Sequence, residues 1–168
     1  NLNSLYGAIL NPGCRFFDKR IGQSTTLTGR TIVKHMSAEV NKTITGTYDH
    51  VGDAMIYGDT DSCYFSAYPT LKKDIDASSI PWSKDNVITL YEQVCEAANE
   101  TFPSFMMQAF HCPKSRSSVI AAGREIVAES GLFITKKRYA ALVYDVEGFR
   151  SDTDGKPGKV KAMGLDLR

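Results

Sequence analysis

Long hydrophobic runs, paired cysteines and metal-spaced histidines are all missing from this sequence, and each absence excludes a class of protein. No apolar run approaches the roughly 18 residues that a transmembrane helix needs. The histidines lie in no HExxH motif and at no other ligand spacing, so we expect them at the surface or at helix caps. They are His35, His50 and His111.

The four cysteines lie far apart and form no CxxC pair, which argues against a zinc site. Scattered single cysteines fit a reducing, intracellular setting better than a disulfide framework. They are Cys14, Cys63, Cys95 and Cys112. The sequence begins with "NLNSLYGAIL", without an initiating Met or a basic-then-apolar targeting segment, so we expect a segment of a longer polypeptide.

The composition is that of a globular protein. The 168 residues are enough for one domain with a core, and 42% of them are hydrophobic and 23% charged. The net charge is only +1, but positive residues cluster in "KKRY" (136–139) and "GKPGKVK" (155–161). Such local clusters decide the choice of partner more than the total charge does.

Apolar spacing predicts three helices. The first ends at "NPG" after residue 10, the second covers residues 22–45, and the third covers residues 86–109, where Pro103 is expected to kink or break it. Residues 69–84 are expected to form a polar connector.

Residues that favour β structure predict two short strands that meet at a bend within 54–65, and further strands at 119–128, 138–147 and 160–163. We expect "ESGLFITKK" (129–137) to be a connection. Strands and helices are segregated, and several strands are joined by short turns. The sequence therefore predicts an α+β fold with a mainly antiparallel sheet and helices packed on one face.

The run "AMIYGDTDSCYF" (54–65) places two carboxylates, Asp59 and Asp61, inside an apolar stretch. On or beside strands they would share a face, roughly 6–7 Å apart, and like charges this close repel unless a cation joins them. Mg²⁺ suits carboxylate oxygens, and two ions about 3.5–4 Å apart serve nucleotidyl transfer. An ordinary polar hairpin turn is the alternative. The apolar and aromatic residues on both sides favour the metal site.

Three motifs together resemble those of family B (alpha-like) DNA polymerases. "YGDTDS" (57–62) is similar to the catalytic carboxylate motif of that family, "NSLYGA" (3–8) to the end of its nucleotide-binding finger helix, and "KKRYA" (136–140) to its primer–template-binding motif. Their order and spacing agree with the family over nearly the whole chain. With "REIVAES" and "KAMGL", the sequence is most similar to the T-even phage type.

The resemblance implies a metal site made of Asp61, Asp59 and Glu125 that holds two Mg²⁺ ions, with Mn²⁺ as a possible substitute. Asp61 and Asp59 would be the catalytic residues, Asp61 bridging both ions and Asp59 supporting it. Glu125, in "REIVAES", matches a further acidic residue near the metal site in phage relatives. A surface glutamate at a strand end is the alternative for Glu125.

The resemblance also implies that Asn3, Tyr6 and Gly7 face the incoming nucleotide. Asn3 and Tyr6 are three residues apart and therefore share one side of a helix. A tyrosine offers a flat surface to the sugar and base, and Gly7 permits close approach. Packing of Tyr6 between helices is the alternative.

A cationic and aromatic group is implied to contact DNA through phosphates and the minor groove, which allows a polymerase to bind every sequence alike. Arg138 and Tyr139 would face opposite sides of a strand, and Lys137 is expected to be the main contact. A solvated turn is the alternative, and Arg168 is a further candidate. The group consists of Lys136, Lys137, Arg138, Tyr139 and Lys161.

By the same resemblance, residues 1–12 would end a fingers helix and residues 13–168 would form most of a palm. The implied activity is template-directed DNA synthesis, in which a deoxynucleoside monophosphate passes from a dNTP to a primer 3′-hydroxyl by a two-metal mechanism. The family's first carboxylate motif, triphosphate-binding lysine, exonuclease and thumb are not found in these residues. We therefore expect this segment alone to be inactive.

Implied partners are primer–template DNA, a dNTP, the remaining polymerase segments in cis or in trans, and a sliding clamp. The implied location is the cytoplasm of an infected bacterial host, away from membranes. One alternative is a catalytically inactive, palm-derived DNA-binding module, against which the presence of Asp59, Asp61 and Glu125 argues. Another is a different two-metal palm enzyme, such as a reverse transcriptase or nucleotide cyclase, which would lack the companion motifs.

Overall fold

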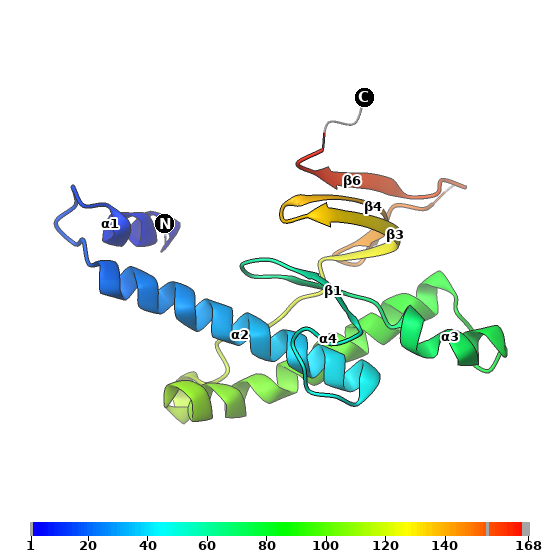
Figure 1. The fold of residues 1–168 in the computed structure, drawn as a ribbon, viewed down its shortest axis with the longest axis horizontal. Coiled ribbons are helices and arrows are strands. Elements are labelled where there is room, and N and C mark those ends of the chain that lie inside the picture. Colours follow the sequence, from blue (N-terminus) through cyan, green and yellow to red (C-terminus); the bar gives the residue numbers. More distant parts are fainter. Residues whose placement is uncertain (1, 154, 166–168) are drawn as a thin grey trace.

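The computed structural model describes residues 2–153 and 155–165 (Figure 1). Its helices are α1 (Leu2–Leu10), α2 (Lys19–Thr45), α3 (Tyr68–Asp76) and α4 (Lys84–Phe110), with a 3-10 helix η1 at Lys114–Arg116. Its strands are β1 (Met55–Gly58), β2 (Cys63–Phe65), β3 (Ile126–Thr135), β4 (Arg138–Val146), β5 (Phe149–Arg150) and β6 (Lys159–Met163). No helix in this described part combines the length and the apolar character needed to span a membrane.

The strands form two antiparallel sheets. β1 pairs only with β2 in one sheet, and in the other β4 pairs with β3, β5 and β6. In Figure 1 both sheets lie on the same side of the long helices α2 and α4. The predicted α+β class, with antiparallel strands and helices to one side, is confirmed, although the strands form two sheets rather than one.

The contact between α2 and α4 forms a base for the β1–β2 hairpin. Buried Val40 of α2 meets buried Val94 and Ala98 of α4 in one apolar cluster. Met55 and Phe65 pack against this cluster and lie opposite each other in the hairpin register. The open end of the hairpin is therefore fastened to the two helices, and its turn extends away from that contact.

His35 joins α2 to α4 from a buried position, so the prediction of a surface or capping histidine is wrong for this residue. Its ring stacks on Phe105 with centroids 3.8 Å apart. Its two ring nitrogens lie 2.8 Å from the Tyr48 hydroxyl and 2.9 Å from the Thr101 hydroxyl. Two hydroxyl partners explain how a polar ring is accommodated between helices.

Three of the predicted element boundaries are wrong. Residues 69–84 are not only a connector, because α3 begins at Tyr68 and has Pro69 in its first turn, where a missing N–H costs nothing. α4 continues through Pro103 as one helix of 27 residues, so the break is wrong. Phe102 and Met106, which precede and follow that proline, are both buried, so the helix is packed against the rest of the protein on both sides of Pro103.

The third wrong boundary concerns β3, which runs from Ile126 to Thr135 instead of ending at residue 128. Residues 119–125 are irregular, and the expected connection 129–137 is mostly strand. Residues 129–132 are all exposed, although successive side chains of a strand point to opposite faces. The sequence there lacks the alternation of a half-buried strand, and pairing with β4 determines the conformation.

Burial of His35 predicts a pH-dependent stability. Burial lowers the pKa of His35 below its ordinary value of about 6.5, so the folded state holds the ring neutral while the unfolded chain takes up a proton. The stabilisation that comes from burying neutral His35 should therefore be complete above that ordinary pKa. The free energy of unfolding should fall as the pH drops below it.

Urea unfolding at pH 8 and at pH 5 measures this effect. The His35→Gln variant should lose part of the pH dependence, whereas His50→Gln, at an exposed position, should keep all of it. An equal pH dependence in His35→Gln and the parent chain would contradict the assignment.

Candidate functional site

Asp59 and Asp61 lie in the turn between β1 and β2, as the sequence predicts. The Asp59 N–H donates to the Ser62 carbonyl at 3.0 Å, and this bond closes the turn. Gly58 and Cys63 are the last paired residues before it. Both carboxylates are thereby carried at the end of the hairpin that projects away from the helices.

The Asp59 carboxylate is hydrogen-bonded to its own hairpin. Its Oδ1 accepts from the Thr60 N–H at 2.8 Å and from the Thr60 hydroxyl at 3.2 Å, and its Oδ2 accepts from the Tyr57 hydroxyl at 3.4 Å. The Thr60 N–H bond above all, with the charges of Lys137 and Lys136 as smaller contributions, lowers the pKa of Asp59. Part of the cost of crowding two anions is therefore offset by the chain itself.

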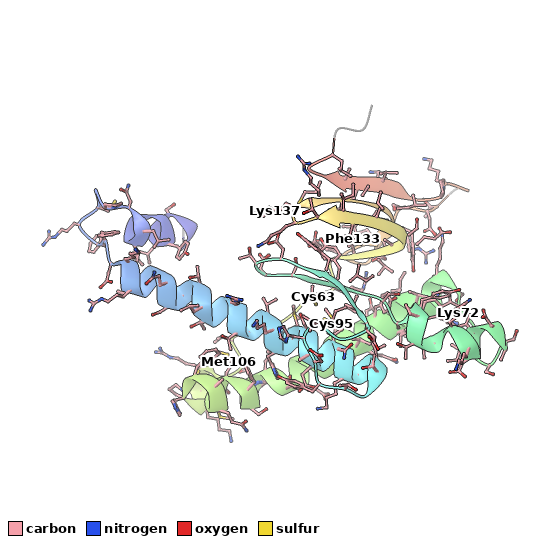
Figure 2. The ribbon with its side chains drawn as sticks, in the orientation of Figure 1. Cys63, Lys72, Cys95, Met106, Phe133 and Lys137 are labelled. Atoms are coloured by element: carbon pink, nitrogen blue, oxygen red, sulfur yellow. The ribbon has the colours of Figure 1, made fainter. Side chains whose placement is uncertain are left out.

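The turn of the β3–β4 hairpin touches the β1–β2 hairpin. Lys137 occupies this turn with a left-handed φ of 62°, and its backbone N–H donates to the Tyr57 hydroxyl at 2.8 Å. Figure 2 shows Phe133 and Lys137 on this hairpin, close to the end of β1 and β2. The two predicted motifs "YGDTDS" and "KKRYA" are thus brought together.

Four aromatic rings fill the contact between the two hairpins, and we call them the aromatic cluster: Tyr57, Tyr64, Phe133 and Tyr139. Ring centroids in neighbouring pairs are 5.3 to 6.3 Å apart. The hydroxyls of Tyr64 and Tyr139 lie 3.0 Å apart. Burial raises the pKa of Tyr64 well above its ordinary value, so the Tyr64 phenol stays neutral.

A cavity of about 570 Å³ lies between the β1–β2 hairpin, α2, α4 and residues 120–131. Asp61 and Glu125 both line it. Asp61 is exposed, and the Glu125 Oε1 lies 2.7 Å from the Lys161 Nζ on β6. The structure therefore brings two of the three predicted metal ligands to one cavity, and the third, Asp59, lies two residues from Asp61 in the same turn.

Asn99 holds the irregular segment that carries Glu125. Its side chain accepts from the Ala122 N–H at 2.7 Å and donates to the Ala122 carbonyl at 3.0 Å. This is the pattern of a strand pair, made by one amide in the middle of α4. An asparagine inside an apolar helical pattern is the one sequence signal for it, and sequence reasoning missed it.

Arg124 is a second anchor that sequence reasoning missed. Its guanidinium pairs with Asp145, which is 1% exposed, and with Glu92 of α4 at 3.0 Å. The Glu125 carbonyl accepts from the Glu147 N–H at 2.8 Å. Glu125 is therefore fixed by its neighbours on both the helix and the sheet.

The donor set at the cavity fits a hard divalent cation. Asp61 and Glu125 offer carboxylate oxygens, and Mg²⁺ typically takes one or two carboxylates and keeps several waters. Across residues 2–153 and 155–165, no group of three or more His, Cys, Asp and Glu side chains is arranged to hold a metal ion. A complete cage would need a further ligand from another segment or from a substrate.

The residues predicted to meet the nucleotide lie at the opposite end of α2 from the hairpin base. Tyr6 is half-buried and Gly7 is exposed on α1, and the side chain of Asn3 lies outside the described part of the structure. α1 is tied to the beginning of α2, where the Asp18 N–H donates to the Ile9 carbonyl at 3.0 Å. Figure 1 shows α1 beside this end of α2.

The predicted DNA-contacting residues divide into two environments. Lys136, Lys137 and Arg138 are exposed at the β3–β4 turn. Tyr139 is 2% exposed within the aromatic cluster, as expected for neighbours on opposite sides of a strand. Lys161 is paired with Glu125, and Arg168 lies outside the described residues.

Comparison with known proteins bears directly on these motifs. The family model described as DNA polymerase family B matches residues 1–78. The DNA-directed DNA polymerase of Escherichia phage RB69 is 29% identical over 176 residues, and that of Enterobacteria phage T4 is 27% identical over 186 residues, each match covering 99% of this chain. The resemblance to T-even-type family B DNA polymerases is confirmed.

The matched relatives are much longer than this chain, which spans 19% of each phage polymerase. DNA polymerase II of Escherichia coli (strain K12) is 35% identical over 63 residues, which cover 38% of this chain and 7% of that protein. The likeness thus extends along the chain for the phage proteins and over a shorter stretch for the bacterial one.

The link through Tyr57 gives a stability prediction. Tyr57→Phe removes one hydroxyl that bonds both hairpins, so it should lower the free energy of unfolding by about 1 kcal/mol. Urea unfolding measures the change. The matched control is Tyr68→Phe, at a tyrosine of α3 that is 39% exposed. It should change the free energy of unfolding by less than about 0.5 kcal/mol. Equal effects of the two variants would contradict the proposed link.

Proposed function

We propose that this chain is the palm part of a DNA polymerase that adds deoxynucleotides from dNTPs to a primer 3′-hydroxyl under the direction of a template. The observation that carries the proposal is the meeting of the two hairpins, which brings the Asp59 carboxylate within the influence of the Lys136 and Lys137 charges, with Asp61 two residues further on in the same turn. Carboxylates for metal ions and lysines for DNA are both needed at a polymerase site. The similarity to the phage polymerases supports the same assignment.

Asp61 and Glu125 are the residues that we assign to hold Mg²⁺, with Asp59 in support. Bound Mg²⁺ would lower the pKa of the primer hydroxyl and neutralise the triphosphate and the leaving pyrophosphate. Asp61 is suited to this role because it is exposed at the cavity. Asp59, whose oxygens are engaged by Thr60 and Tyr57, orients the turn and keeps it anionic.

The exposed lysines and arginine at the β3–β4 turn are assigned to the primer–template backbone. Lys137 is held by its own backbone bond to Tyr57, so its side chain leaves the turn from a fixed point. Tyr139 acts from inside the aromatic cluster and positions the strand that carries Arg138. Contacts of this kind read no sequence, as DNA synthesis on any template requires.

Residues 1–12 are assigned to the end of a fingers helix, with Asn3, Tyr6 and Gly7 toward the dNTP, and residues 13–168 to the palm. The first carboxylate motif, the rest of the fingers, the thumb and the exonuclease would come from other polymerase segments, and a sliding clamp is a further partner. Because the metal cage is then shared between segments, these 168 residues alone should not polymerise.

The test of this function is Asp61→Asn in a polymerase that contains this segment. Nucleotide addition should fall by roughly 10³-fold or more, because several kcal/mol of charge stabilisation are lost, while primer–template binding stays nearly unchanged. Single-nucleotide extension and DNA-binding titrations measure the two quantities. Asp74→Asn, exposed on α3, is the matched control. Normal turnover in Asp61→Asn would refute the assignment.

A second prediction concerns Lys137. Lys137→Ala should weaken DNA binding about equally for different sequences and reduce the slope of log affinity against log salt by about one counterion. Lys72→Ala, on α3 and well apart from Lys137 in Figure 2, is the control and should leave the slope unchanged. A loss confined to one DNA sequence would argue against a backbone contact.

A further inference from the structure

Lys161 is placed by the sheet to reach Glu125. The register of β4 and β6 pairs Lys161 with Ala141, and Ala141 in turn pairs with Gly131 of β3. Lys161, Ala141 and Gly131 therefore lie side by side across the three strands. Ala141 and Gly131 both line the cavity. The small Ala141 leaves room for the long Lys161 side chain beside it, and the Lys161 Nζ lies 2.7 Å from the Glu125 Oε1.

The ion pair between Lys161 and Glu125 is weak enough for a divalent cation to take the place of the ammonium. The Lys161 and Glu125 side chains are 36% and 57% exposed, and ion pairs so open to water contribute little to stability. Glu125 keeps its place without the pair, because the Arg124 contacts and the bond from the Glu147 N–H hold the backbone beside it. Loss of the lysine would therefore leave the Glu125 backbone in place and its carboxylate at the cavity.

We propose that Lys161 is the resident counterion of Glu125 and that a divalent cation and the Lys161 ammonium occupy this carboxylate in turn. The inference rests on the proposed function in taking Glu125 as a metal ligand. Without a divalent ion, Lys161 neutralises Glu125 beside Asp61. When the ion binds, the ammonium is displaced and becomes available to a DNA phosphate, so that metal binding and DNA contact are coupled through one side chain.

Manganese binding to the 168-residue chain tests the exchange, with water-proton relaxation as the measure of bound Mn²⁺. Lys161→Met removes the competing charge and keeps the apolar stem, so it should tighten Mn²⁺ binding roughly tenfold. Lys161→Arg, which keeps the charge, and Lys156→Met, in the exposed loop before β6, should leave the affinity near that of the parent. The gain should vanish in a Glu125→Gln background.

Lysine acetylation followed by mass spectrometry is a readout that does not depend on affinity. Mg²⁺ at constant ionic strength should raise the modification of Lys161, and Glu125→Gln should raise it without Mg²⁺. Unchanged Mn²⁺ affinity in Lys161→Met, or the same gain in the Glu125→Gln background, would overturn the exchange.

Mn²⁺ binding by the two variants distinguishes a failure of this inference from a failure of the proposed function. If Asp61→Asn abolishes Mn²⁺ binding but Lys161→Met has no effect, the exchange is wrong and the metal site stands. If Asp61→Asn leaves Mn²⁺ binding unchanged in both the parent and Lys161→Met chains, the assigned metal site is wrong and the exchange falls with it.

Discussion

The Tyr57 hydroxyl, which accepts from the Lys137 N–H and donates to Asp59, joins the two hairpins that carry the charged residues of the site. Around it the aromatic cluster fills the contact with four rings. The β1–β2 hairpin could not hold its turn alone, because an isolated two-stranded ribbon is marginal in water, whereas the β3–β4 hairpin belongs to a four-stranded sheet. The spacing between acidic and basic groups is therefore fixed by apolar packing behind them.

Two side-chain amides, one buried on α2 and one half-buried on α4, transmit the rigidity of the helices to these hairpins. Asn41 of α2 donates to the Thr47 carbonyl at 2.8 Å and accepts from the Ala54 N–H at 3.0 Å, which fixes the chain just before β1. Asn99 of α4 does the same for Ala122, just before Glu125. Both acidic segments thus start from a helix-anchored point, and the cavity between them has defined walls.

The sequence predicts the features that depend on local chemistry. The carboxylate hairpin, the long amphipathic helix at 22–45 and the exposed lysine turn follow from spacing and residue type, and the structure contains all three. The full length of β3 and the continuity of α4 through Pro103 could not be predicted, because pairing with β4 and burial of Phe102 decide them. Asn99 and Arg124 act through partners 23 and 21 residues away, a separation that no local pattern reveals.

The assignment of Asp61 and Glu125 to one divalent-cation site is the central claim of this account. Paramagnetic broadening by substoichiometric Mn²⁺ in the amide NMR spectrum of the ¹⁵N-labelled chain tests it most directly. Broadening should begin at residues 59–62 and 124–126 and should disappear from both in Asp61→Asn. Broadening that begins instead at other acidic positions, such as Asp85 and Asp152 at the start of α4 and after β5, would contradict it.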